Sequence, residues 1–185
     1  SYLYSQLEGQ ASVTSVDYGT DSAEKDFINL DLTDINKVNN FSENCDYFDS
    51  IIFLVGLAHA KGKGKDLPEF KKINCQTLVN LLSALSDNNK VPHKIIFAST
   101  ISVYGEKYKQ STYAEDSEKK PFSPYAVTKL EAEQYLLDKY SDKSWILRFA
   151  PVYSPNFLLN INHRTRMGGS FYRVGKGARK LSLCN

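Results

Sequence analysis

A nearly continuous apolar run from Ser50 to Val55 restricts the possible folds of this chain more than any other feature. Such runs form the central strands of parallel sheets, because these strands are buried on both faces. A helical pattern follows from Glu69 to Leu85, and a second strand-like run extends from Lys94 to Ser99. The spacing then predicts a helix over Pro124 to Tyr140 and a strand over Trp145 to Phe149. This alternation predicts an α/β fold with a doubly wound parallel sheet.

Two shorter strands are predicted before the apolar run, over Ser12 to Val16 and over Phe27 to Leu30. Residues Ser1 to Leu7 space their apolar side chains like one face of a helix, so we expect the chain to open inside a helix.

Composition and charge exclude several classes of partner. The 185 residues are 42% hydrophobic and 24% charged, which suits a soluble unit with a real core. A formal net charge of +2 is too small to argue for nucleic acid, and no long apolar run indicates a membrane partner. Cys45, Cys75 and Cys184 show neither a pairing nor a metal-ligand pattern, and His93 and His163 have no partner in sequence. We therefore expect reduced thiols, a cytoplasmic location and no metal site.

Tyr125 and Lys129 stand four residues apart on the predicted helix and so share one of its faces. A phenol with a pKa of about 10 is a poor base at neutral pH, but a neighbouring cation favours the phenolate. Thr100, directly after the strand that ends at Ser99, can add a hydroxyl that binds the same substrate oxygen. Together the three side chains form a candidate proton relay. The alternative is a packed Tyr125 and a solvated Lys129, a pairing that occurs by chance on many helices.

Three segments carry a family resemblance. Ile95 to Gly105 (IIFASTISVYG) is followed by Ser123 to Lys129 (SPYAVTK) and by Trp145 to Pro155 (WILRFAPVYSP). In this order they resemble the extended short-chain dehydrogenase/reductase family, and within it the nucleotide-sugar epimerases and dehydratases. Ser154 stands where the family usually has glycine. The resemblance implies a Rossmann-like domain that binds NAD, with Tyr125 as the base.

The resemblance also implies a set of cofactor contacts. Asp17 would stand at the end of the strand predicted over Ser12 to Val16, where the family carries an acidic residue that binds the adenosine ribose. A carboxylate there repels a 2′-phosphate, so it favours NAD over NADP. Asp31 and Leu32 would lie beside the adenine, and the turn from Leu54 would pass close to the pyrophosphate. The expected cofactor-binding residues are Asp17, Asp31, Leu32, Leu54, Val55, Gly56, Asn74, Ala98, Tyr125, Lys129, Phe149 and Val152.

Two of these positions have equally ordinary structural interpretations. Asn74 can face the cofactor, or it can be a buried amide that ties a strand to a helix. The segment around Asp31 can instead provide a helix N-cap, through Thr33 or Asp34. We interpret Asp31 as functional and Asp34 as structural.

The chain departs from the family pattern at both ends. Residues 1–20 contain no counterpart of the glycine-rich turn that binds the pyrophosphate. We therefore expect residues 1–155 to form an NAD-binding Rossmann domain that lacks its first strand. Residues 156–185 would begin the substrate-binding region, and both ends would continue in the natural chain.

The implied reaction is epimerisation of a nucleotide sugar, like that of a UDP-glucose/galactose 4-epimerase, through a transient keto sugar. Ile101 and Ser102 stand where dehydratases of the family carry an acidic pair, which makes elimination of water less favoured. A keto-sugar reductase or a dehydratase remains an alternative, and a non-catalytic NAD(P)-sensing protein is an alternative from another class. Relatives commonly pair through the helix that carries the tyrosine, so a homodimer is a further expectation.

Overall fold

The computed structural model describes residues 2–19, 24–58, 66–105, 112–152, 166–167 and 170–171, with only the backbone for 166, 167 and 171. Ser154, His163, Cys184 and most of the expected substrate region lie outside these residues. Within the described part no helix is long and apolar enough to cross a bilayer. The same residues hold no cluster of three or more His, Cys, Asp or Glu side chains suited to a metal ion.

The central sheet is parallel and has the order β3 (Ser50–Phe53), β4 (Lys94–Thr100), β5 (Ser144–Phe149). The β4 strand lies in the middle, and its Ile95 and Phe97 are fully buried. Phe97 stacks on Phe53 of the neighbouring strand, with ring centroids 6.2 Å apart. These side chains form the sheet's part of the hydrophobic core.

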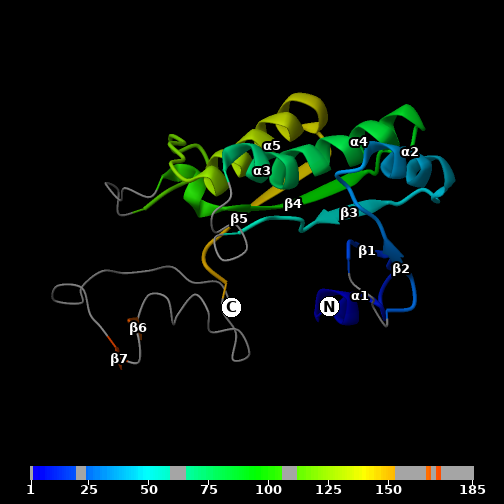
Figure 1. The fold of residues 1–185 in the computed structure, drawn as a ribbon, viewed down its shortest axis with the longest axis horizontal. Coiled ribbons are helices and arrows are strands. Elements are labelled where there is room, and N and C mark those ends of the chain that lie inside the picture. The colour runs from blue at the N-terminus through cyan, green and yellow to red at the C-terminus, as the bar shows by residue number, and fades with distance from the viewer. Residues whose placement is uncertain are drawn as a thin grey trace.

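Four helices cover one face of this sheet: α2 (Ile35–Asn44), α3 (Leu67–Lys71), α4 (Thr77–Asp87) and α5 (Pro124–Tyr140) (Figure 1). A π-helical segment, η1 (Lys72–Gln76), joins α3 to α4. The α3 helix begins with a capping box, in which Asp66 and Glu69 each bind the other's backbone N–H. The α5 helix begins at Pro124 because Ser123 caps it by accepting from the Ala126 N–H.

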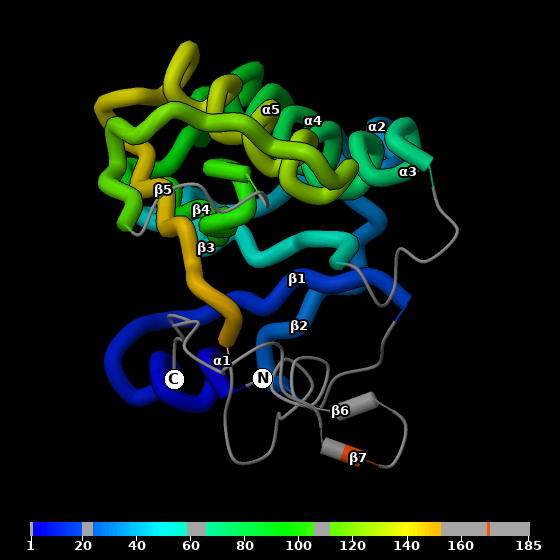
Figure 2. Tube along the Cα trace, turned by 90° about the vertical axis from the view of Figure 1, so that its left-hand side faces the viewer, coloured from blue at the N-terminus to red at the C-terminus, as the bar shows by residue number. Residues whose placement is uncertain are grey.

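A smaller parallel pair, β1 (Ser15–Asp17) and β2 (Phe27–Asn29), lies with α1 (Tyr2–Leu7) on the opposite side of the central sheet from these helices (Figures 1 and 2). Asn80 of α4 binds the segment that follows β2, since its Nδ2 donates to the Leu32 carbonyl at 2.9 Å.

The α2 helix is fixed at both ends by side chains. Asp34 caps its start by accepting from the N–H groups of Asn36 and Lys37, which confirms the structural interpretation of Asp34. Lys90 closes its end, because its ammonium donates to the carbonyls of Ser42, Glu43 and Cys45 at 2.8–2.9 Å.

The parallel α/β architecture predicted from the sequence is confirmed, with several local differences. The single helix predicted over Glu69 to Leu85 consists of α3, η1 and α4, and the helix α2 was not predicted. The strand predicted over Ser50 to Val55 ends at Phe53, and a 3-10 segment, η2 (Ile101–Tyr104), directly follows β4. A short antiparallel pair, β6 (Arg166–Met167) and β7 (Ser170–Phe171), lies near the C-terminus of the chain.

Candidate active site

Lys129 lies at the centre of the candidate site and is only 2% exposed. Its ammonium donates to the carbonyls of Val55, just after β3, and of Ala98 in β4, at 3.1 and 3.0 Å. It also lies 4.7 Å from the centre of the Phe97 ring. The alternative of a solvated Lys129 is therefore excluded. One buried cation joins the carboxyl-terminal parts of two neighbouring parallel strands to α5.

Burial lowers the pKa of Lys129 to about 8, because a charged ammonium loses its water shell, and the anionic side chain of Glu133 opposes this shift. Near neutral pH the side chain thus keeps its charge, but only by a narrow margin.

Tyr125 is half-buried, one helical turn before Lys129. Burial raises its pKa, and a hydrogen bond with the Thr100 side chain opposes this shift. The predicted lowering of the Tyr125 pKa by Lys129 is therefore not seen. The physical reason is that the ammonium points at two strand carbonyls and not at the phenol.

Thr100 is the last residue of β4 and caps η2, since its hydroxyl accepts from the Ser102 N–H at 3.2 Å. The structure thus brings together the Thr100 and Tyr125 side chains, as the sequence predicted, and places Lys129 on the same helix as Tyr125. In chemical terms, two neighbouring hydroxyls and a buried cation one turn away can accept and hold a proton.

Asn74 is fully buried in the middle of the π-helical segment η1. Its amide binds both backbone groups of Leu57: the Leu57 N–H donates to Oδ1, and Nδ2 donates to the Leu57 carbonyl at 3.3 Å. Nδ2 also donates to the Thr128 hydroxyl at 3.1 Å. Asn74 therefore ties the segment after β3 to the relay helix, which is the structural interpretation of this residue. Its contact with a cofactor remains a prediction.

Gly56 lies against this same arrangement. A Cβ added at Gly56 would stand 3.2 Å from the Lys129 ammonium and 3.8 Å from Oδ1 of Asn74. Only a residue without a side chain leaves the backbone this close to the buried cation.

The remaining expected cofactor residues lie within or just beyond the central strands. The side chains of Leu54, Phe149 and Val152 are exposed, while Val55 and Ala98 are half-buried.

The acidic residues expected on the adenosine side lie at the end of the smaller pair. Asp17 is exposed, and its Oδ1 accepts from the Tyr18 N–H at 2.7 Å. Oδ1 of Asp31 accepts from the Thr33 hydroxyl and N–H at 2.8 and 2.9 Å. The Thr33 hydroxyl is the main reason that the pKa of Asp31 lies below its ordinary value. The next residue, Leu32, is buried.

The residues present fit a dinucleotide. An ammonium has three N–H donors, and within the described part of the chain Lys129 uses two of them on carbonyls. The third donor suits a ribose hydroxyl, and the bare backbone at Gly56 suits close passage of a pyrophosphate. Asp31 has one carboxylate oxygen that makes no hydrogen bond with the described residues.

Sequence reasoning missed a buried ionic group beside the relay. Glu133 is fully buried, and its carboxylate binds Arg148 of β5 in a fork, with an Nη2–Oε2 distance of 2.7 Å. The signal was present in the sequence, since Glu133 follows Lys129 by four residues and so shares its helix face.

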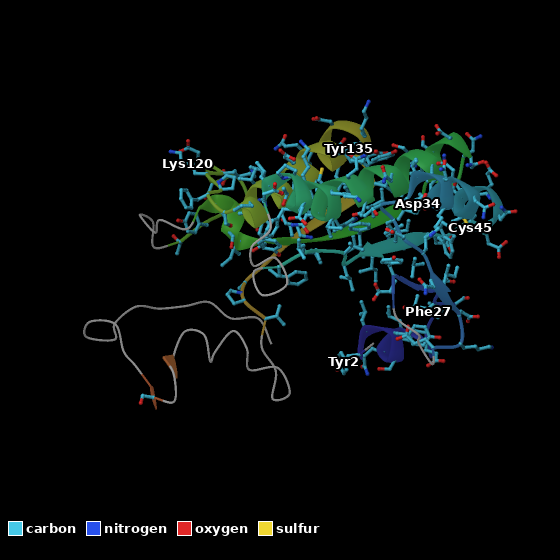
Figure 3. The ribbon with its side chains drawn as sticks, in the orientation of Figure 1. Tyr2, Phe27, Asp34, Cys45, Lys120 and Tyr135 are labelled. Carbon is cyan, nitrogen blue, oxygen red and sulfur yellow. The ribbon has the colours of Figure 1, made fainter. Side chains whose placement is uncertain are left out.

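A hollow between β2 and α2, lined among others by Asn29, Lys37 and Cys45, takes no part in this arrangement. Cys45 lies at one end of the molecule, and Lys120, which precedes α5, lies at the other (Figure 3).

Comparison with known proteins gives the family. The model of the NAD dependent epimerase/dehydratase family matches residues 1–177. A curated relative, described as an uncharacterized UDP-glucose epimerase, YtcB, of Bacillus subtilis (strain 168), is 42% identical over 107 residues. The match covers 56% of this chain and 30% of that protein.

Solved structures agree with this assignment. A UDP-glucose 4-epimerase from Thermotoga maritima, solved with UDP-glucose, has a TM-score of 0.69 and 25% identity, over 83% of this chain and 52% of that chain. MoeE5, in complex with UDP-glucose and NAD, has a TM-score of 0.68 and 27% identity, over 83% and 51% of the two chains. A UDP-glucuronic acid 4-epimerase from Bacillus cereus, in complex with NAD, has a TM-score of 0.55 and 30% identity, over 70% and 40%.

The chain thus spans about half the length, or less, of these relatives. The family model nevertheless matches almost all of it, and the parallel Rossmann-like fold agrees with that of the solved relatives. The chain belongs to the NAD dependent epimerase/dehydratase family, whose cofactor is NAD, and the resemblance predicted from its sequence is confirmed.

Proposed function

We propose that this chain carries the cofactor domain and proton relay of an NAD-dependent epimerase that acts on a nucleotide sugar. One observation carries the proposal: a buried Lys129 joins two strand ends one helical turn from Tyr125, whose hydroxyl is hydrogen-bonded to Thr100. Buried, charged groups of this kind at strand ends are typical of catalytic sites in open α/β sheets.

In this proposal Tyr125 is the base that takes a proton from a sugar hydroxyl and later returns it. Thr100 holds the same oxygen through its hydroxyl, and Lys129, whose ammonium donates to the carbonyls of Val55 and Ala98, would keep a positive charge one helical turn from the phenol. Burial raises the pKa of Tyr125 and its hydrogen bond with Thr100 opposes this shift, so the proposal relies on Thr100 to favour the phenolate. A bound NAD would supply the acceptor, and later the donor, of the hydride that leaves and returns to the sugar carbon.

The residues proposed to hold NAD fall into two groups. Asp17, Asp31 and Leu32 would bind the adenosine half, and the acidic group of Asp17 favours NAD over NADP. The turn at Leu54, Val55 and Gly56, together with Asn74 and Ala98, would border the pyrophosphate and ribose. Phe149 and Val152 would lie beside the nicotinamide.

A UDP-sugar is the proposed substrate class, because the curated relative and the solved relatives are named for UDP-sugars. Epimerisation is preferred to dehydration because Ile101 and Ser102 offer no carboxylate after Thr100. The structure gives Ser102 another role, since its N–H and hydroxyl both bind the Thr100 hydroxyl.

The organisation of the whole protein belongs to the same proposal. Residues 1–155 would form the NAD-binding domain and residues 156–185 would begin the substrate region. The enzyme would act in the cytoplasm, as a homodimer.

The test uses protein produced from the complete reading frame, as wild type and as Tyr125→Phe. Wild type is expected to bind NAD and to interconvert UDP-glucose and UDP-galactose, or another pair of UDP-sugar epimers, followed by NMR. Tyr125→Phe should keep its NAD affinity and lose about 10²- to 10⁴-fold in kcat, because it lacks the base.

Tyr135→Phe is the matched control. Tyr135 lies on the same helix (Figure 3). Its hydroxyl lies 3.5 Å from the Ser83 hydroxyl, and it is not one of the proposed relay residues. Its kcat should therefore stay within about twofold of wild type. Failure of wild type to bind NAD would overturn the proposal, and so would full activity in Tyr125→Phe.

A further inference from the structure

The candidate relay is bordered by a buried ion pair that the proposed chemistry does not use. Glu133 is 0% exposed. Its Oε1 accepts from the Ser99 hydroxyl at 2.5 Å and from Nε of Arg148 at 3.1 Å, and its Oε2 accepts from Nε and Nη2 of Arg148 at 3.1 and 2.7 Å. One carboxylate from α5 therefore binds both β4 and β5.

Arg148 also binds two residues outside α5 and the sheet, Tyr104 and Glu115. Its Nη1 donates to the Tyr104 hydroxyl at 2.7 Å and to the Glu115 carbonyl at 3.0 Å. The guanidinium lies 5.1 Å from the centre of the Tyr104 ring, which in turn stacks on Tyr113. Arg148 thus connects the sheet to η2 and to the segment that precedes α5.

The position of this pair relative to the relay is specific. Ser99 directly precedes Thr100 on β4, and Glu133 stands one helical turn after Lys129 on α5. The Glu133 carboxylate therefore connects two elements of the relay. It lies on α5, which carries Tyr125 and Lys129, and it binds β4, which carries Thr100.

Stability alone gives a weak reason for such a pair. Removing two charges from water costs several kcal/mol per ion, and well-packed apolar replacements are often equally stable. A bidentate pair with a fully buried carboxylate and a partly exposed guanidinium instead fixes distance and angle between the elements that it joins. A relay needs this precision, because a misplacement of about 1 Å can cost about a hundredfold in rate.

We propose that Glu133, held by Arg148, is a positioning residue of the proton relay, which sets the Thr100 strand end against the Tyr125–Lys129 helix and places an anion beside the Lys129 ammonium. This inference rests on the proposed function and deepens it. The charged and titratable groups around Glu133 are Lys129 on its own helix and Arg148 on β5, with Tyr104 bound to the far side of Arg148.

The test compares Glu133→Gln with Glu131→Gln in the protein from the complete reading frame. Glu131 is a matched control, since it lies on the same helix but pairs with Lys71 near the surface at 3.1 Å. Glu133→Gln should lower kcat by about ten- to hundredfold while the KM and the NAD affinity change little. Glu131→Gln should match wild type.

The pH profile separates positioning from stability. Removal of the Glu133 charge removes the contribution that raises the pKa of Lys129, so Lys129 should lose its proton at lower pH. The alkaline limb of the kcat profile should therefore move to lower pH in Glu133→Gln and stay in place in Glu131→Gln. A change in melting temperature with an unchanged kcat and pH profile would overturn the inference.

Ser99→Ala keeps the inference testable if Glu133→Gln does not fold. This substitution leaves the ion pair intact and removes only the bond to β4. It should lower kcat by at least about threefold without moving the alkaline limb, because the charge beside Lys129 remains. In that case an unchanged kcat in Ser99→Ala overturns the proposal.

The two proposals fail in different ways. If wild type neither binds NAD nor converts a sugar, the proposed function falls and this inference falls with it. If wild type does both and Glu133→Gln behaves like Glu131→Gln, only the inference is overturned.

Discussion

The two ends of the proposed cofactor site are built differently. Near α5 the polar side chains are buried and each has several partners, as with Lys129, Asn74 and Glu133. Near β1 and β2 the acidic side chains of Asp17 and Asp31 are more accessible, and among the described residues their hydrogen bonds come from groups one or two residues away. The first region is held together by contacts among its own residues, whereas the second holds groups that are open to a ligand.

This difference has a physical basis. A proton relay requires fixed distances between its atoms, and burial strengthens the interactions that fix them. Recognition of an adenosine requires accessible hydrogen-bond acceptors, and water can satisfy these acceptors until the ligand binds. Substitutions in the relay region should therefore change both stability and activity, whereas substitutions near β1 and β2 should mainly change cofactor affinity.

The largest expected effect is the pH dependence created by Lys129. Its pKa is about 8 in the folded chain and 10.5 in the unfolded chain. Between these values the unfolded state binds more protons, so the stability of wild type should rise with pH. The gain relative to Lys129→Met should reach about 3 kcal/mol between pH 8 and 10.5. Urea unfolding of both proteins across this range measures the difference.

Lys139→Met is the control for that experiment, because Lys139 lies on the same helix and is exposed. Its stability should follow the pH dependence of wild type. Parallel curves for wild type and Lys129→Met would mean that Lys129 is solvated in solution and that the relay region is less rigid than its contacts indicate.

The next effect in size concerns Asn74. Asn74→Ala removes three hydrogen bonds and leaves the N–H and carbonyl of Leu57 without their partner. The free energy of unfolding should fall by about 2 kcal/mol, measured by urea unfolding. Asn36→Ala, on the exposed face of α2, should change it by less than about 0.5 kcal/mol. Equal losses in the two variants would contradict the proposed contrast between the regions.

A smaller effect is expected at Asp31. Its pKa lies below the ordinary value, chiefly because of the Thr33 hydroxyl, so its contribution to stability is present above about pH 4 and is lost as the pH falls further. Asp31→Asn should cost at most about 1 kcal/mol at pH 7, since an amide oxygen can still accept from Thr33. NAD affinity should fall roughly tenfold, measured by calorimetry. Unchanged affinity would remove Asp31 from the cofactor site.

The smallest change in stability is expected at Asp17, which is exposed. Asp17→Asn should alter the free energy of unfolding by less than about 0.5 kcal/mol. Its effect should appear in cofactor choice, because loss of the carboxylate removes the repulsion of a 2′-phosphate. The ratio of NADP to NAD affinity should rise roughly tenfold, and an unchanged ratio would assign the discrimination to another residue.

The sequence predicted those parts of the fold that local patterns encode. The spacing predicted the bounds of α5 correctly, from Pro124 to Tyr140. The apolar runs predicted β3 and β4, although β3 ends two residues early. By contrast α2 was missed, because its many asparagines have low helix propensity and the side chains of Asp34 and Lys90 at its ends stabilise it.

The candidate site was less predictable. The spacing of Tyr125 and Lys129 indicated a shared helix face, but spacing alone could not show that the ammonium would turn to the carbonyls of Val55 and Ala98. That choice depends on how close β3 comes to α5, which is a property of the tertiary structure. The spacing of Glu133 from Lys129 was visible in the sequence, but its partner was not, since Arg148 lies on another element.

The π-helical segment η1 makes the relay sensitive to the length of the chain. Each residue of an α-helix turns the chain by about 100°, so a segment with one extra residue rotates α3 relative to α4. Deletion of a single residue between Lys72 and Gln76 would restore a regular helix and carry the Asn74 amide away from Leu57. Loss of a single residue from η1 would therefore alter the geometry of the site, although none of the proposed relay residues would change.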